Sequence, residues 1–295
     1  MKNKKLGFSI ILGSFLVFSI LWGMLFGARI QEILYSPLIT PEQWCQTQPC
    51  IEIFLFGKLL KLVKPTSSII VYSLGFITLI LGMILLYSQK KHQSRLWWGI
   101  ALILWGLGAL FAGTSYQLFS YQLKCAGNIY CVWTTWYEII YLLLSVGSID
   151  AMFSAQIYSC LESKKQKLYF IYTLGHFLFY FVIILIGAYI PVRFLISFEF
   201  FIIYLIPNIL FFLILNGKRY LQYHNLMDRN LIIIWISLII IIAAYFIYYL
   251  SGLTDFLWNF GIWFSENDVL HIGLIIWMIY IQFVVRKQIV DYMKN

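Results

Sequence analysis

Long apolar runs separated by short polar segments dominate the chain. Crossing the roughly 30 Å hydrocarbon layer as a helix takes about 20 residues, and eight runs approach or exceed that length. They extend approximately over Leu6–Gly27, Ser68–Tyr87, Trp97–Leu118, Trp136–Ser159, Tyr169–Ile190, Ile196–Leu215, Leu231–Leu250 and Val269–Val285. Transmembrane β-strands would give shorter, alternating segments. The pattern predicts an all-α, polytopic transmembrane bundle that forms one domain over 1–295.

The longest polar gap, residues 28–66, separates the first run from the other seven. Its apolar stretch Ile51–Val63 is too short to span a membrane and is interrupted by Gly57 and three lysines. We expect this gap to be an outer loop that carries an amphipathic helix on the membrane surface. The chain would then consist of one anchor helix followed by a seven-helix unit.

The first run follows the basic start MKNKK and could be mistaken for a signal peptide. Its apolar length exceeds the 7 to 15 residues that are typical of such peptides, and bulky Phe26 stands where cleavage needs a small residue. We therefore expect a retained anchor.

Composition and charge support a membrane protein and predict its orientation. The chain is 62% hydrophobic and 11% charged, unlike soluble domains. With both termini cytoplasmic, inner segments hold fifteen of the 21 Lys and Arg residues: Lys2, Lys4, Lys5, Lys90, Lys91, Arg95, Lys164, Lys165, Lys167, Lys218, Arg219, Arg229, Arg286, Lys287 and Lys294. This bias favours that orientation, with the bacterial cytoplasmic membrane as the expected location. It also accounts for the net charge of +9 without a nucleic-acid partner.

The cysteines agree with this orientation. Cys45 and Cys50 fall in one outer loop, and Cys125 and Cys131 in another, whereas Cys160 lies at an inner helix end. Four outer cysteines suit disulfides on an oxidising face. Each loop could close locally, or the two loops could be joined, and neither pair has the two-residue spacing of structural zinc sites.

Small residues recur along the third run. Gly106, Ala109 and Gly113 lie at helical spacing in WGLGALFAG. Such a stripe is typical of close helix packing.

Polar side chains within the apolar layer are candidates for function, because burying them in lipid is costly. The expected topology places one group of them near the outer surface: Ser115, Gln117, Glu138, Glu199, Asn267, Asp268 and His271. This convergence predicts an outward-facing polar pocket. In it, Ser115 is a candidate nucleophile or water-positioning hydroxyl, and Glu138 a candidate base or ligand.

The C-terminal helix carries the candidate imidazole of this pocket. Asn267 and His271 share a helix face, and Asp268 is placed to orient the imidazole of His271. The alternative is that the acidic residues complement the dipoles of the helix N-termini where they lie.

Two further groups lie deeper in the predicted bundle. Asp150 is near the centre of the run Trp136–Ser159, and His176 is in the inner half of the next run. If these neighbouring helices pack antiparallel, the two side chains can pair. Such a pair is either a structural contact between helices or part of a proton or ion path.

Ser115, Glu138 and His271 lie at positions that resemble those of the alkaline ceramidase and adiponectin-receptor superfamily. The segment IIWMIY, which follows His271 in the last run, adds to this resemblance. That resemblance implies a seven-helix membrane hydrolase that cleaves lipid amides with zinc held by three histidines. Phe119 and Asn267 stand where two of those histidines would be, so His271, Glu138 and Asp268 would have to supply the metal ligands.

The leading hypothesis is a membrane-embedded hydrolase of a lipid or acyl-linked substrate, with Ser115, Glu138, Asp268 and His271 at its site and zinc as its candidate metal. The second is a solute or proton-coupled transporter that uses Asp150 and His176. The third is a non-catalytic scaffold or assembly factor that binds a partner through its outer loops. The chain contains no nucleotide-binding fingerprint that would indicate an ATP-driven pump.

Overall fold

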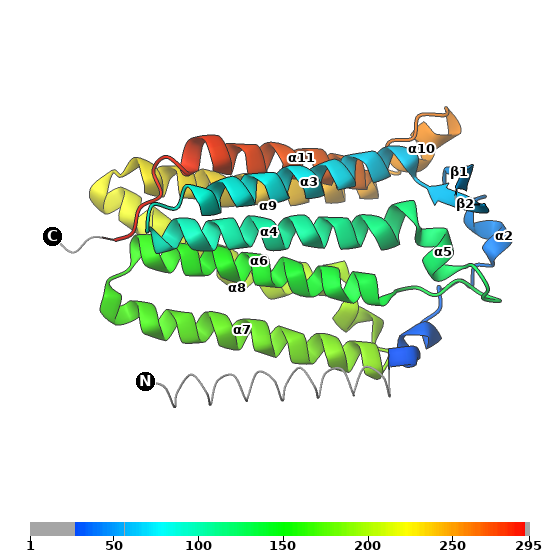
Figure 1. Ribbon diagram of the computed structural model, residues 1–295, viewed down its shortest axis with the longest axis horizontal. Helices are drawn as coiled ribbons and strands as arrows, with labels where there is room; N and C mark the ends of the chain where they lie inside the picture. Colours follow the sequence, from blue (N-terminus) through cyan, green and yellow to red (C-terminus); the bar gives the residue numbers. More distant parts are fainter. Residues whose placement is uncertain (1–26, 56, 293–295) are drawn as a thin grey trace.

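The computed structural model describes residues 27–292 except residue 56. Within this range, seven helices are long and apolar enough to cross a membrane. They are α3 (Pro65–Tyr87), α4 (Gln93–Ala112, continued by the π-helical turn η2, Gly113–Leu118), α6 (Trp136–Cys160), α7 (Ser163–Tyr189), α8 (Phe198–Tyr223), α9 (Leu226–Leu250) and α11 (Glu266–Tyr280, continued by η4, Ile281–Val285). All seven run along the long axis of the molecule (Figure 1). They confirm the predicted helical bundle for this part of the chain, and the predicted anchor before Gly27 lies outside the described residues.

Six of the helices form a closed ring. Neighbours pack in the order α3, α4, α6, α8, α9 and α11, and α11 returns to α3. The seventh helix, α7, packs against α6 and lies at the lower edge of the bundle in Figure 1. Spans that follow one another in the sequence run antiparallel, so the ring neighbours α6 and α8, and likewise α11 and α3, run parallel.

Glycines on α3 and α4 allow the closest approach in this ring. A Cβ added to Gly106 would lie 2.8 Å from the carbonyl oxygen of Gly75, and one added to Gly82 would lie 3.0 Å from that of Gly99. Contact at this range is available only without side chains. The predicted role of Gly106 in helix packing is therefore confirmed.

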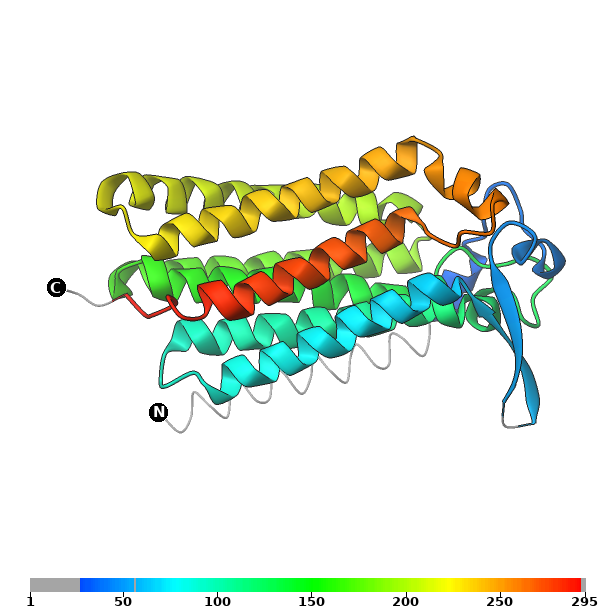
Figure 2. The ribbon, with the colours of Figure 1, turned by 90° about the horizontal axis from the view of Figure 1, so that it is seen from above.

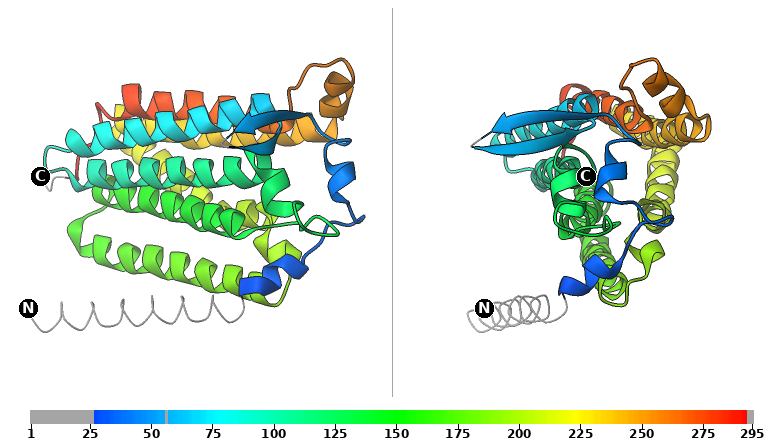
Figure 3. Two further views of the ribbon diagram at one scale, coloured as in Figure 1. Left: turned by 45° about the vertical axis from the view of Figure 1, so that its right-hand side comes forward. Right: turned by 90° about the vertical axis from the view of Figure 1, so that its right-hand side faces the viewer.

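One end of the bundle, which we call the capped end, carries the shorter elements. They are η1 (Gly27–Glu32), α2 (Pro41–Trp44), β1 (Cys50–Leu55), β2 (Lys58–Val63), α5 (Ser120–Lys124) and α10 (Leu253–Asn259). Figure 3 shows them gathered at this end. The cap has its own small apolar core, in which Trp44, Val63, Cys125 and Cys131 are buried.

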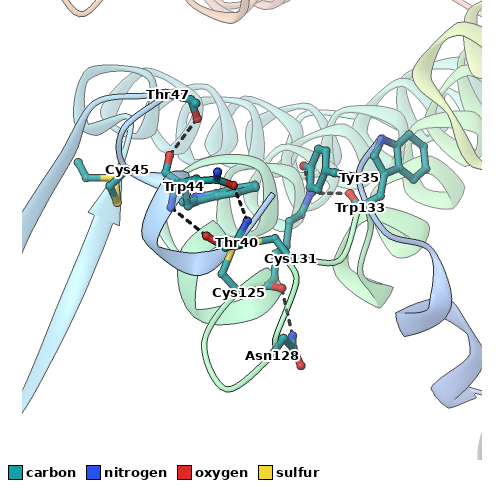
Figure 4. The surroundings of a disulfide bond; sticks show 12 residues. Tyr35, Thr40, Trp44, Cys45, Thr47, Cys125, Asn128, Cys131 and Trp133 are labelled. Carbon is teal, nitrogen blue, oxygen red and sulfur yellow. Dashed lines mark hydrogen bonds between the residues drawn. A yellow bond between two sulfur atoms is a disulfide. The ribbon is translucent and has the colours of Figure 1, made fainter. Parts of the chain in front are cut away.

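Two local disulfides hold the cap together. Cys45 pairs with Cys50, and Cys125 pairs with Cys131. Of the alternatives open from sequence, local closure of each loop is the one observed. Figure 4 shows Trp44 and Thr40 beside the second bridge, and the Trp44 ring lies 5.4 Å from that of Tyr35.

The predicted surface helix over Ile51–Val63 is wrong, because this stretch forms an antiparallel hairpin of β1 and β2. Cys50 pairs with Val63 and Leu55 with Lys58, and Gly57 adopts a φ of 74° at the turn. A helix would place Gly57 in its interior at a cost of about 1 kcal/mol, whereas a tight turn uses its freedom at positive φ. The hairpin projects sideways from the bundle (Figure 2).

Candidate functional site: a cavity inside the helix ring

A cavity of about 330 Å³ occupies the interior of the ring at the capped end. All six ring helices line it, and none of the described residues of α7 does. Its deeper wall is mainly apolar, with the hydroxyl of Ser145 on α6 as an exception, and is formed by Leu74, Trp105, Ala109, Ala112, Ile149, Phe201, Ile202, Leu205, Ile209, Leu238, Ile242, Leu270 and Leu274. The helices α6 and α8 each turn one face toward the cavity. Lining residues recur about once per helical turn, at 141, 145 and 149 on α6 and at 201, 205 and 209 on α8.

Aromatic side chains fill the ring below this cavity. Trp235 and Trp277 are buried one turn farther from the capped end than the lining residues Leu238 and Leu274. The ring of Trp277 lies 5.5 Å from that of Trp105 and 6.4 Å from that of Trp235. Trp277 Nε1 donates to the carbonyl oxygen of Ile234 at 2.9 Å, which fixes its indole. The cavity thus has a packed floor near mid-bundle and its polar groups at the other end.

The mouth of the cavity combines charged and polar side chains from the cap and the helix ends. They are Gln48, Lys64, Gln117, Lys124, Glu199, Asn267 and His271. Gln117 is only 2% exposed, and its Oε1 has no hydrogen-bond partner among the described residues. Nδ1 of His271 is also buried and has no hydrogen-bond partner among the described residues. Because buried polar atoms nearly always have partners, these two mark a place where a ligand or water would supply them.

Ser115 and Glu138 meet, as predicted, but in a network beside the cavity. Ser115 Oγ donates to Glu138 Oε1 at 2.7 Å and lies 2.6 Å from Thr135 Oγ1. Lys124 Nζ lies 2.6 Å from the same Glu138 oxygen. Both Ser115 and Glu138 are buried, and neither lines the cavity. This hydrogen bond and the ion pair tie η2, α5 and α6 together, and the catalytic role of Ser115 stays a prediction.

Lys124 is the member of this network that the sequence did not reveal. Its ammonium also donates to the carbonyl oxygen of Trp133 at 2.9 Å. Burial alone would lower the pKa of Lys124, but the Glu138 carboxylate and the Tyr35 hydroxyl together outweigh it, and the pKa lies above its ordinary value. Its position next to Cys125 was the available signal, since a disulfide loop can hold a short helix over the bundle.

Asp268 lies in the first turn of α11, where the alternative prediction had acidic residues complement the helix dipole. Its Oδ2 accepts from the Ser265 backbone N–H at 2.6 Å and from Ser67 Oγ at 2.9 Å. With Ser265 it forms a capping box at the start of α11, and Ser67 links that cap to α3. Among the described residues, no hydrogen bond joins Asp268 or Ser115 to His271.

Asp150 and His176 are paired, and the expected packing of α6 against α7 is confirmed. His176 Nδ1 lies 2.9 Å from Asp150 Oδ1. Asn208 of α8 adds a donor to Asp150 at 3.3 Å, and the hydroxyl of Tyr172 donates to Asn208 Oδ1 at 2.7 Å. None of these four residues lines the cavity. The group joins three helices, and its predicted part in transport stays a prediction.

The described residues do not assemble the zinc site that the ceramidase resemblance implies. Within residues 27–292, no group of three or more His, Cys, Asp or Glu side chains is close enough to hold a metal ion. Glu138 and Asp268 are each engaged by other partners, and His271 lines the cavity without them. Zinc with this ligand set therefore does not fit the site.

Comparisons with known proteins place the helices of the ring in one family. No match of significance was found among curated proteins or among solved structures. A family profile covers residues 66–289, which include the cavity-lining helices and exclude the hairpin of the cap. The profile is that of a family of unknown function, DUF6962, and the chain belongs to this family.

Proposed function

We propose that the protein is an integral membrane protein that binds one amphiphilic, lipid-like molecule in the ring cavity. The observation that carries this proposal is the polarity of the cavity wall, which is apolar at mid-bundle and hydrogen-bonding at the capped end. A hydrocarbon chain fits the first part and a headgroup the second. The volume falls in the range of small-molecule binding sites, about 300–1,000 Å³.

The expected orientation supports access from the outer leaflet. If both termini are cytoplasmic, the capped end faces the oxidising side, where the disulfides Cys45–Cys50 and Cys125–Cys131 are stable. The basic residues of the opposite loops favour the same orientation. The cavity mouth would then lie at the depth of the outer headgroups of a bacterial cytoplasmic membrane.

Adjacent isoleucines on α8 provide the test. Ile202 lines the cavity, whereas Ile203 is 53% exposed on the outside of the bundle. Ile202→Phe should narrow the cavity, and Ile203→Phe adds the same volume outside it. We expect purified wild-type protein and Ile203→Phe to retain one amphiphile per chain by native mass spectrometry, and Ile202→Phe to lose most of it. Equal retention in both variants, or no bound amphiphile in the wild type, contradicts the proposal.

A second candidate is hydrolysis of such a molecule, because His271 presents a nitrogen without a partner to the cavity mouth. In this case His271 acts as general base toward a water. Ser115, Glu138 and Asp268 then hold the surrounding helices. His271→Ala should abolish turnover of acyl-linked lipids by protein in nanodiscs, with His176→Ala as the matched control. Equal turnover in wild type and His271→Ala would exclude the hydrolase.

A further inference from the structure

Lys64 brings a positive charge to the cavity mouth, where the Glu266 and Asp268 carboxylates lie near it but form no ion pair with it. It lies between β2 and α3 at a φ of 47°, fixed by its N–H donating to the Pro49 carbonyl oxygen at 2.8 Å. Its ammonium lies 5.6 Å from the centre of the Trp258 ring, and no described residue forms an ion pair with it. Burial lowers the pKa of Lys64, opposed in part by the nearby Glu266 carboxylate. A partly desolvated ammonium gains most from an anion that shares its site.

The other charges at the mouth are already balanced or hydrated. The Lys124 ammonium is paired with Glu138, 2.6 Å away. Glu199 also lines the cavity, but it is exposed to solvent and needs no partner. Its negative charge weakens the attraction for a second negative charge on a ligand. Of the two lysines that line the cavity among the described residues, Lys64 is therefore the one left to pair with a single negative charge on a ligand.

Hydrogen-bonding groups without partners accompany this charge. Gln117 carries a buried amide and His271 a buried ring nitrogen on the wall of the same cavity. The unpartnered nitrogen of His271, when it carries the proton, donates to an oxygen of a carboxylate or phosphodiester, whereas the unpartnered atom of Gln117 is its carbonyl Oε1, which accepts from a hydroxyl or N–H of a ligand. The chain of the ligand adds little selectivity, because lipid tails in a bilayer are already in an apolar solvent.

From these contacts, and resting on the proposed binding function, we propose that the cavity selects a single-chain amphiphile with one negative charge on its headgroup. Lys64 supplies the counter-charge, the ring N–H of His271 donates to the headgroup, and Gln117 Oε1 accepts a hydrogen bond from a hydroxyl or N–H of the ligand. A carboxylate and a phosphodiester share this chemistry.

Four probes with one oleoyl or oleyl chain separate the headgroups. Oleate carries a carboxylate, and oleoyl-lysophosphatidylglycerol a phosphodiester. Oleyl alcohol is neutral, and oleoyl-lysophosphatidylcholine is zwitterionic. We expect at least one of the two anions to bind wild-type protein in neutral-lipid nanodiscs roughly tenfold or more tightly than oleyl alcohol and the zwitterion, which is the scale of a charge-assisted hydrogen bond.

Variants of Lys64 test whether this residue provides the selection. Lys64→Gln should remove the preference for the anion while oleyl alcohol binds as before, and Lys64→Arg should restore it. Lys61→Gln is the matched control, since it removes a positive charge from the same end at a residue that does not line the cavity. Restoration by arginine distinguishes lost charge from misfolding.

Two results overturn the proposal in distinguishable ways. If oleyl alcohol or the zwitterion binds as tightly as both anions, or if Lys64→Gln keeps the preference, the headgroup assignment is wrong and amphiphile binding stands. If none of the four probes binds, the proposed function fails and the headgroup assignment fails with it.

Discussion

The ion pair between Lys124 and Glu138 shows that one buried lysine determines how a predicted site residue is engaged. Both side chains are 2% exposed, so each neutralises a charge that would otherwise be isolated. The sequence predicted Ser115 and Glu138 as members of one site, because helical spacing and the expected topology placed them at the same depth. The same reasoning missed Lys124, because depth along the apolar runs says nothing of a residue whose position depends on the Cys125–Cys131 loop folding back over the bundle.

Glu138→Gln should be strongly destabilising, because it leaves the Lys124 ammonium buried without its counter-charge. The expected loss is about 3–5 kcal/mol, and the double variant Glu138→Gln with Lys124→Met should recover most of it. Thermal unfolding of the three proteins in detergent measures both values. A double variant no more stable than Glu138→Gln alone would show that the pair is not the cause.

The same pair determines the expected pH dependence. Because the folded-state pKa of Lys124 is raised, its contribution is fully present below the ordinary lysine pKa of about 10.4 and is lost as pH rises through the folded-state value. Wild-type stability should therefore show no loss from this group between pH 7 and pH 9.

At the scale of elements, length and composition predicted the spans well, whereas the hairpin required information that composition does not carry. The spans α3 to α11 are long apolar runs, and any helix crossing a bilayer must satisfy its backbone internally. The stretch Ile51–Val63 is short enough for either structure. The hairpin is stabilised by cross-strand contacts such as Glu52 with Lys61, 3.5 Å apart, and by the nearby Cys45–Cys50 bridge.

The contact between α3 and α4 gives a prediction at this scale. In Gly106→Ala the new methyl group meets the Gly75 carbonyl oxygen at 2.8 Å, and backbone cannot move aside as a flexible side chain would. We expect a loss of about 1–3 kcal/mol, measured by unfolding in detergent. Gly217→Ala on α8 is the matched control, because its added Cβ meets nothing within 4 Å. That control should be stabilised by about 0.5–1 kcal/mol. Equal effects of the two substitutions would contradict the close packing.

At the scale of the whole molecule, the two sets of polar residues that the sequence predicted lie at different places around the ring. Gln117 and His271 line the cavity, whereas Asp150 and His176 lie on the α7 side of α6. Sequence placed each group at a depth along the bundle but not at an angle around it, because one helix can turn either face to its neighbours. A transport role for Asp150 would require a path other than this cavity.

Access to the cavity depends on which side of the membrane the capped end faces, and one exposed position beyond each end of α6 tests this. Asn128 is exposed in the cap before α6, and Lys165 is exposed beyond the far end of the same helix, so the two lie at opposite ends of one span. In a Cys160→Ser background, Asn128→Cys should react with a membrane-impermeant maleimide on intact cells, and Lys165→Cys should react only after permeabilisation. The reason is the excess of Lys and Arg in the loops on the side of Lys165, which resist translocation. The reverse pattern would place the cavity mouth and both disulfides on the reducing side of the membrane, and would remove outer-leaflet lipids as the source of its ligand.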